Sequence, residues 1–152
     1  MNETTKMPVG MIIILILIGW GLVSILFVLK NPVAQLGPFL FKGASAIVIN
    51  LIYAIIIVSI IFGVIKRFIW AWKLTIGYYI FSILLVIVNM LSFYTNKGKF
   101  LTFYTQGISP ELAQLITESS IAMTLTFSSI AGIILGLIII WYFNKKKDFF
   151  VN

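Results

Sequence analysis

The chain contains no cysteine and no histidine among its 152 residues. The lack of cysteine excludes disulfides, thiolate nucleophiles and iron–sulfur ligation. The lack of histidine removes the commonest metal ligand and the commonest acid–base group of proteins. The sequence also lacks a glycine-rich phosphate loop, so we identify no catalytic residue, no metal ligand and no cofactor-binding residue.

Charge is also scarce, since charged residues make up 10% of the chain and hydrophobic residues 61%. A soluble domain usually carries about 25% charged residues. A surface facing water could not be covered with so few charges. The composition therefore indicates a lipid bilayer as the natural solvent.

Four long windows of the sequence lack charge altogether. Lys, Arg, Asp and Glu are absent from residues 7–29, 43–65, 74–96 and 119–144. A helix rises about 1.5 Å per residue, so roughly 20 apolar residues cross a hydrocarbon core about 30 Å thick. We therefore predict an all-α integral membrane protein, a four-helix bundle that forms one membrane domain over residues 1–152. The expected membrane helices are 8–29, 44–65, 74–95 and 119–143.

The basic residues outside these windows predict the orientation in the membrane. Four spans place both termini on one side, which holds seven Lys and Arg residues, against four on the opposite side. The positive-inside bias then favours cytoplasmic termini in the cell membrane. The net charge of +7 is explained by cations that flank spans and contact anionic headgroups. We expect no nucleic-acid partner, because no separate basic domain is present.

The segment KRFIWAWK, residues 66–73, is expected to form the cytoplasmic turn between the second and third spans. Indole rings suit the membrane interface, and Lys and Arg can bury their stems while their charges stay among headgroups. No turn residue explains the reversal, although Gly63 and Gly77 would ease close approach of the two helices. The expected anchors on this side are Lys66, Arg67, Trp70, Trp72, Lys73, Trp141, Lys145, Lys146 and Lys147.

A hairpin of this kind, with basic residues and WAW between two spans, resembles many small prokaryotic membrane proteins. The resemblance covers that hairpin alone and implies no functional residue. The richness in Ile, Lys, Asn and Phe is also typical of an AT-rich prokaryotic genome.

Two longer segments lie on the other side of the membrane. Residues 30–42 are broken by two prolines, and we expect them to form an interfacial loop. In the second segment, Ser109 and Pro110 favour the start of a helix. The fourth span could therefore be preceded by a continuous or an interfacial helix from residue 110.

Small residues recur at intervals of four in the fourth window. Apolar area does not distinguish one helix face from another in lipid, so small residues and polar pairs decide the packing. This stripe ends in a GxxxG motif, which would allow another backbone to approach closely. The expected packing residues are Ser120, Thr124, Ser128, Gly132 and Gly136.

The third window has a period of seven, which is typical of left-handed helix packing. Its polar members should face the protein, because lipid offers no hydrogen-bond partner. The residues of this heptad seam are Thr75, Tyr78, Ser82, Leu85, Asn89 and Ser92.

Asn50 and Asn89 are expected to form an intramembrane polar pair. Both lie roughly 24 Å by helix rise from the turn between the second and third spans, so they should lie at the same depth. We expect them to face each other or to share a third polar partner such as Tyr53. They would serve either as interhelical packing or as the lining of a polar path.

Trp20 lies in the sequence GWG, deep within the first window rather than near either interface. A buried indole N–H needs an acceptor. We expect Trp20 to be a packing residue between helices, with Gly19 and Gly21 making room for a neighbour.

These features predict a non-catalytic polytopic membrane protein, either an accessory or scaffolding subunit of a membrane complex or a homo-oligomer. Its protein partners would contact the small-residue stripe. A small channel or facilitator for a neutral solute is the alternative, and its path would be lined by Asn50, Ser82, Asn89 and Thr124. Proton coupling is disfavoured because the windows hold no ionisable acid or base. A membrane enzyme acting on a lipid-like substrate is the third hypothesis.

Overall fold

The computed structural model describes residues 6–30, 32–105 and 117–150. Within these ranges the chain forms five α-helices, a short 3-10 helix and one two-stranded sheet. Four of the helices are long and apolar enough to cross a membrane. The prediction of a helical protein with four such segments is therefore confirmed. The helices are α1 (Val9–Val28), α2 (Ala44–Ile65), α3 (Ile69–Thr95), α4 (Lys97–Thr105) and α6 (Glu118–Lys145).

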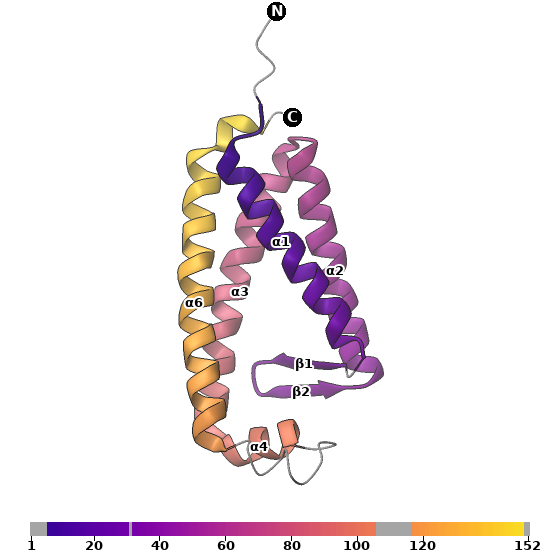
Figure 1. Cartoon of the computed structure of the whole chain (residues 1–152), viewed down its shortest axis with the longest axis vertical. Coiled ribbons are helices and arrows are strands. Elements are labelled where there is room, and N and C mark those ends of the chain that lie inside the picture. The colour runs from indigo at the N-terminus through magenta and orange to yellow at the C-terminus, as the bar shows by residue number, and fades with distance from the viewer. Residues whose placement is uncertain (1–5, 31, 106–116, 151–152) are drawn as a thin grey trace, which may run out of the picture.

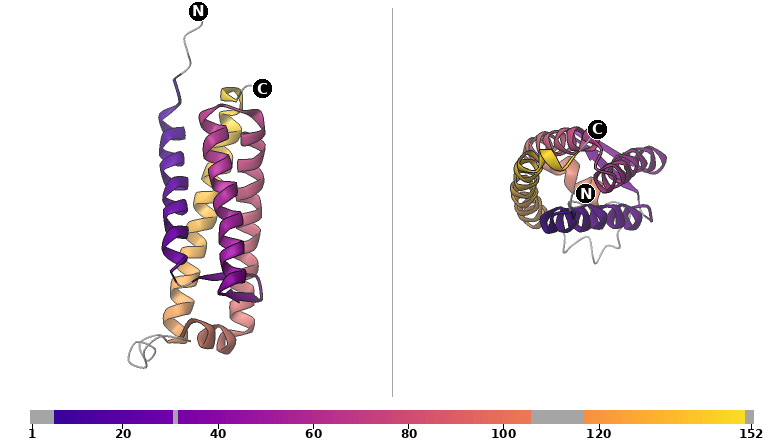
Figure 2. Two further views of the ribbon diagram at one scale, coloured as in Figure 1. Left: turned by 90° about the vertical axis from the view of Figure 1, so that its right-hand side faces the viewer. Right: turned by 90° about the horizontal axis from the view of Figure 1, so that it is seen from above.

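The four long helices lie side by side, and α1 begins at the same end of the molecule at which α6 ends (Figure 1). We call this the terminal end. The opposite end holds the sheet and α4, and we call it the hairpin end. Helix α6 runs along α3, whereas α1 crosses obliquely from α6 at the terminal end to α2 at the hairpin end (Figures 1 and 2). This oblique course separates α1 from α6 toward the hairpin end.

The main cluster of buried apolar side chains lies where all four long helices meet, on the terminal side of the molecule. Such close packing is what stabilises contacts between helices in lipid, because the hydrophobic effect does not favour one apolar face over another. The cluster comprises Met11, Ile14, Ile18, Ile57, Ile60, Val64, Ala71, Ile139, Phe143 and Phe150.

The turn between α2 and α3 is shorter than the segment KRFIWAWK. Arg67 takes a φ of 60°, and the N–H of Phe68 donates to the carbonyl of Gly63 at 2.9 Å. The N–H of Arg67 donates to the carbonyl of Val64 at 3.1 Å. These two bonds form a Schellman motif, with an arginine at the position where glycine is usual. The reversal therefore uses a residue type that sequence patterns do not associate with this motif.

Helix α3 begins at Ile69, whereas the uncharged window placed its start near residue 74. Phe68 has extended backbone angles and is the N-cap, and no helix breaker follows it. At the start of α3, Ala71 packs directly on Gly63 of α2, since a Cβ placed on Gly63 would lie 2.5 Å from the Cβ of Ala71. Gly63 thus provides the expected close approach, whereas nothing lies within 4 Å of a Cβ placed on Gly77.

The heptad seam of α3 faces the rest of the protein. All six of its members are buried or half-buried, while neighbouring positions such as Ile80, Leu84 and Leu91 are exposed. The polar members of this seam are therefore covered by the chain's own elements to a greater extent than these neighbouring positions are.

Residues 33–42, part of the expected interfacial loop, form an antiparallel hairpin of β1 (Val33–Leu36) and β2 (Phe39–Lys42). Val33 pairs with Lys42, and Leu36 pairs with Phe39. Gly37 has a φ of 61° at the first position of the turn, as a II′ turn requires. The hairpin extends from the ends of α1 and α2 toward α3 (Figure 1). The sequence did not predict these strands, because the expected interfacial loop holds two prolines and its apolar and polar residues do not alternate.

Helix α6 begins at Glu118, and Thr117 caps it. The Thr117 side chain accepts a hydrogen bond from the N–H of Ser120, and the Ser120 side chain accepts one from the N–H of Thr117. This reciprocal pair is a capping box. Most of the expected helix from residue 110 lies outside the described residues.

Candidate functional site

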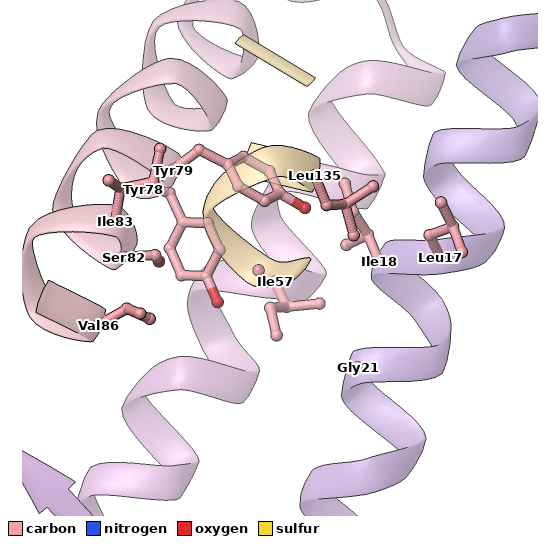
Figure 3. A pocket seen from close by; sticks show the side chains of 11 residues that line it. Leu17, Ile18, Gly21, Ile57, Tyr78, Tyr79, Ser82, Ile83, Val86 and Leu135 are labelled. Atoms are coloured by element: carbon pink, nitrogen blue, oxygen red, sulfur yellow. The ribbon is translucent and has the colours of Figure 1, made fainter. Parts of the chain in front are cut away.

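A cavity of about 240 Å³ lies among the four long helices (Figure 3). It adjoins the buried cluster, since Ile18 and Ile57 belong to the cluster and also line the cavity. Most of its walls are aliphatic. It is lined by Leu17, Ile18 and Gly21 of α1, Ile57 of α2, Tyr78, Tyr79, Ser82, Ile83 and Val86 of α3, and Gly132 and Leu135 of α6.

The polar groups of the cavity all come from α3. Tyr79 reaches from α3 toward Ile18 and Leu135, and its hydroxyl points into the space between the helices (Figure 3). Tyr78 lies beside it and Ser82 follows one turn later. Among the described residues, none forms a hydrogen bond with the Tyr79 hydroxyl. Tyr79 was not among the residues expected to be functional, although a tyrosine in the middle of an apolar window, away from the interface, was a usable signal.

The depth of the cavity follows from helix rise. Tyr79 lies ten residues along α3 from Ile69, which is about 15 Å from the terminal end of that helix. Ile18 lies nine residues along α1 from Val9, or about 14 Å. A cavity at these positions would lie within a hydrocarbon core about 30 Å thick.

One side of the cavity is open between α1 and α6. Leu17 and Leu135 line the cavity and are also exposed on the outer surface. Two glycines contribute to the same gap, because nothing lies within 4 Å of a Cβ placed on Gly21 or on Gly132. The cavity therefore communicates with the surroundings of the helices rather than being sealed.

Asn50 and Asn89 both hydrogen bond with the hairpin. The side-chain oxygen of Asn89 accepts from the backbone N–H of Gly37 at 2.6 Å. The backbone carbonyl of Asn89 accepts from the side-chain amide of Gln35 at 3.4 Å. The side-chain amide of Asn50 donates to the Val33 carbonyl at 3.3 Å. The hairpin thus lies between the two asparagines. It bonds with Asn50 through Val33 of β1, and with Asn89 through Gln35 of β1 and the turn residue Gly37.

Lysines fasten the hairpin to α4. Lys42 donates to the carbonyl of Phe103 at 2.9 Å, and its ammonium lies 4.4 Å from the centroid of the Phe103 ring. Lys99 donates to the carbonyl of Pro38 at 3.4 Å. Together with the asparagine bonds, these contacts hold the hairpin across the molecule beyond the ends of α1 and α2.

The four residues that were expected to line a solute path have different surroundings. Asn50 and Asn89 contact the hairpin, and Ser82 lines the cavity. Thr124 is exposed on α6, and its carbonyl accepts from the Ser128 hydroxyl at 2.7 Å.

The small-residue stripe of α6 divides into two parts. Gly136 is buried against α3, and a Cβ placed on it would lie 3.1 Å from Ile83. Its other members are exposed: Ser120, Thr124, Ser128 and Gly132.

Helix α6 packs on α3 mainly through a different face from the stripe. Ser129, Ile139 and Phe143 are buried on that face. The hydroxyls of Tyr94 and Thr126 form a hydrogen bond of 2.7 Å between the two helices. Ser120, Thr124 and Ser128 therefore lie outside this contact with α3, and Gly132 borders the open side of the cavity.

Trp20 does not pack between helices of this chain, which differs from the expectation for a buried indole. Its side chain is 71% exposed, and no described residue accepts a hydrogen bond from its indole N–H. Nothing lies within 4 Å of a Cβ placed on Gly19, so this glycine makes no room for a helix of the same chain. The oblique course of α1 turns this face outward.

The residues that were expected to be interface anchors lie at the terminal end. The indole N–H of Trp72 donates to the carbonyl of Phe143 at 3.1 Å, and Lys147 lies 5.1 Å from the Trp72 ring centroid. Arg67 lies 4.7 Å from the Phe149 ring centroid. These contacts tie the end of the chain to the start of α3. Exposed members of the set are Lys66, Trp70, Lys73, Trp141, Lys145 and Lys147, and the half-buried members are Arg67, Trp72 and Lys146.

At the hairpin end, an ion pair joins α4 to α6. The Lys97 Nζ atom lies 2.7 Å from the Glu118 Oε1 atom. The hydrogen bond from Lys97 to the Glu118 carboxylate, and the attraction between the two charges, raise the pKa of Lys97 above its ordinary value. Both side chains are substantially exposed, so the pair connects two elements at the surface rather than within a site.

Comparisons of this chain with protein-family models, with curated proteins and with solved structures found no match.

Proposed function

We propose that this chain is a non-catalytic, multi-pass protein of the cell membrane, a four-helix bundle with both termini in the cytoplasm. It works as a structural subunit that assembles with copies of itself through the outer faces of α1 and α6. A polar N–H in hydrocarbon carries a free-energy cost unless it is hydrogen bonded. The observation that carries the proposal is the exposed Trp20 indole, which has no partner among the described residues.

The depth of Trp20 matches that of the exposed stripe on α6. Gly10 and Tyr142 contact each other, since a Cβ placed on Gly10 would lie 2.6 Å from the Tyr142 hydroxyl. From this common level, Trp20 is ten residues along α1 and Gly132 is ten residues back along α6. Each distance is about 15 Å by helix rise. An assembly whose axis is normal to the membrane keeps every residue at its own depth, so these two faces can meet.

The α6 face supplies both space and an acceptor. Gly132 leaves room for an indole ring, and Ser128 lies one turn away on the same exposed face. The Ser128 hydroxyl donates to Thr124, which leaves its oxygen lone pairs free to accept. Trp20 of one copy, packed on Gly132 of a neighbour, would donate its N–H to Ser128 of that neighbour.

The proposed orientation rests on the cations of the terminal end. Exposed lysines and tryptophans at this end suit a surface rich in anionic headgroups. The hairpin end carries fewer cations, and Lys42, Lys97 and Lys99 all have partners within the protein.

The assembly is tested with the variant Trp20→Leu and the matched control Phe27→Leu. Both residues are large, aromatic and exposed on α1, at 71% and 69%, but Phe27 lies closer to the membrane surface and has no polar group. The mass of the purified protein in a mild detergent is measured by light scattering. We expect Trp20→Leu to shift the protein toward a single copy, and Phe27→Leu to leave the assembly intact.

Ser128→Leu should reproduce the effect of Trp20→Leu, because it removes the acceptor and adds bulk to the α6 face. A single copy for the unaltered protein, or equal assemblies for the unaltered protein and Trp20→Leu, would refute self-association through this face. An accessory role in a complex with other proteins would appear as co-purifying subunits that Trp20→Leu releases.

A further inference from the structure

We propose that the cavity among α1, α2, α3 and α6 binds a neutral lipophilic molecule that carries one hydrogen-bonding oxygen, a hydroxyl or a carbonyl, and that enters from the bilayer between α1 and α6. This inference does not depend on self-association, because its specific contact is Tyr79 of α3. The two proposals share only Gly132, which borders the cavity and also belongs to the exposed face of α6. Trp20 does not line the cavity.

The chemistry of the walls defines the class of ligand. Aliphatic side chains from all four long helices surround the space, and none of its lining residues is charged. A charged ligand would therefore leave an unpaired charge in hydrocarbon, which is costly. An apolar body matches the aliphatic walls, and a single polar group matches the small number of hydroxyls on the α3 side.

Tyr79 supplies the specific contact. Its hydroxyl points into the cavity (Figure 3) and has no hydrogen-bond partner among the described residues. A phenol can both donate and accept, so it can bond with either a hydroxyl or a carbonyl oxygen. Binding pockets typically combine apolar walls with a few convergent polar groups, and Tyr78 and Ser82 lie beside Tyr79 to complete this wall.

The size of the cavity limits the ligand. Its volume of about 240 Å³ exceeds the roughly 150 Å³ of an apolar cavity known to admit benzene. A bicyclic ring of about ten heavy atoms is therefore a suitable probe. A longer lipid could insert one end while the remainder stays in the bilayer.

The route of entry follows from the exposed part of the lining. Leu17 of α1 and Leu135 of α6 border both the cavity and the outer surface. Gly21 and Gly132 widen the gap between these helices, since a Cβ added to either glycine would meet no atom within 4 Å. A molecule dissolved in the bilayer can therefore reach the cavity sideways, without passing the hairpin.

The test compares 1-naphthol with naphthalene, two probes that differ by one hydroxyl. The full-length protein is placed in lipid nanodiscs, and equilibrium dialysis at neutral pH measures binding in excess of that to empty nanodiscs. We expect 1-naphthol to saturate near one molecule per chain. Naphthalene should bind about tenfold more weakly, the ratio that corresponds to the net contribution of one hydrogen bond.

Three variants locate the binding. Tyr79→Phe removes the hydroxyl with little change of shape, so it should abolish the preference for 1-naphthol while leaving naphthalene binding unchanged. Val86→Phe fills the cavity and should reduce the binding of both probes. Leu84→Phe adds bulk to an exposed position of α3 and should alter neither.

Binding that rises linearly without saturation, or equal affinity of the two probes for the unaltered protein, would overturn the proposal. The same conclusion follows if Tyr79→Phe retains the full preference for 1-naphthol. Tyr79→Phe keeps the test decisive even if Val86→Phe fails to fold. Because self-association is tested at Trp20 and ligand binding at Tyr79, failure of one proposal leaves the other intact.

Discussion

At the scale of single residues, Asn89 has the largest predicted effect on the hairpin end. Its side-chain oxygen accepts a short bond of 2.6 Å from the Gly37 N–H. Asn89→Ala leaves that N–H without its acceptor, which typically costs about 1–3 kcal/mol when the group is buried. We expect a loss of that size in the free energy of unfolding, measured by titration with SDS in mixed micelles.

Asn50→Ala is the matched control for Asn89→Ala. Asn50 donates to Val33 through a longer bond of 3.3 Å at an exposed position, so water or a headgroup can replace the lost group. Its effect should be well below that of Asn89→Ala. Equal losses for the two variants would contradict the view that Asn89 is the main attachment of the hairpin.

The Lys97–Glu118 ion pair predicts a dependence of stability on alkaline pH. Because Glu118 raises the pKa of folded Lys97 above the ordinary value of 10.5, folding favours the protonated amine. Its contribution is fully present below pH 10.5 and is lost as the pH rises through the raised pKa. The difference in melting temperature between the unaltered protein and Glu118→Gln should therefore stay constant up to about pH 10 and shrink above it. A difference that persists undiminished at about pH 12 would rule out this assignment.

At the scale of secondary-structure elements, the contact between α2 and α3 depends on Gly63. Gly63→Ala would place a Cβ 2.5 Å from the Cβ of Ala71, so the two helices must separate. Overpacking of this kind typically costs about 1–3 kcal/mol. We expect that loss in the free energy of unfolding, again measured by SDS titration.

Gly77→Ala tests the same substitution in α3 where space is available. Nothing lies within 4 Å of the new Cβ, and alanine favours a helix over glycine by about 0.5–1 kcal/mol. Gly77→Ala should therefore leave stability unchanged or raise it. If both alanines were tolerated equally, the close packing at the turn would not be a determinant of stability.

At the scale of the whole molecule, the proposed orientation can be measured directly because the chain has no native cysteine. Gly98 in α4 and Asn144 near the end of α6 are both exposed. Helix α4 and the end of α6 lie at opposite ends of the molecule (Figure 1). A membrane-impermeant maleimide added to intact cells should label Gly98→Cys. It should label Asn144→Cys only after the membrane is permeabilised. The reverse pattern would place the termini outside.

The number of long apolar helices could be predicted from the sequence, because the thickness of the hydrocarbon core sets the length of each uncharged window. The inward face of α3 could be predicted as well, since Thr75, Ser82 and Asn89 need partners that lipid does not offer. Both inferences depend on local composition and on the solvent, and neither requires knowledge of which helices are neighbours.

The tertiary structure alone decided how these helices are used. The oblique course of α1 turns Trp20 outward and opens the gap beside Gly132, and the hairpin between Asn50 and Asn89 depends on contacts between distant segments. Arg67 adopts a left-handed conformation in the turn that joins α2 to α3. In a bilayer, no apolar helix face is favoured over another by the hydrophobic effect. Packing between helices therefore determines which faces meet, which stay exposed and where a cavity remains.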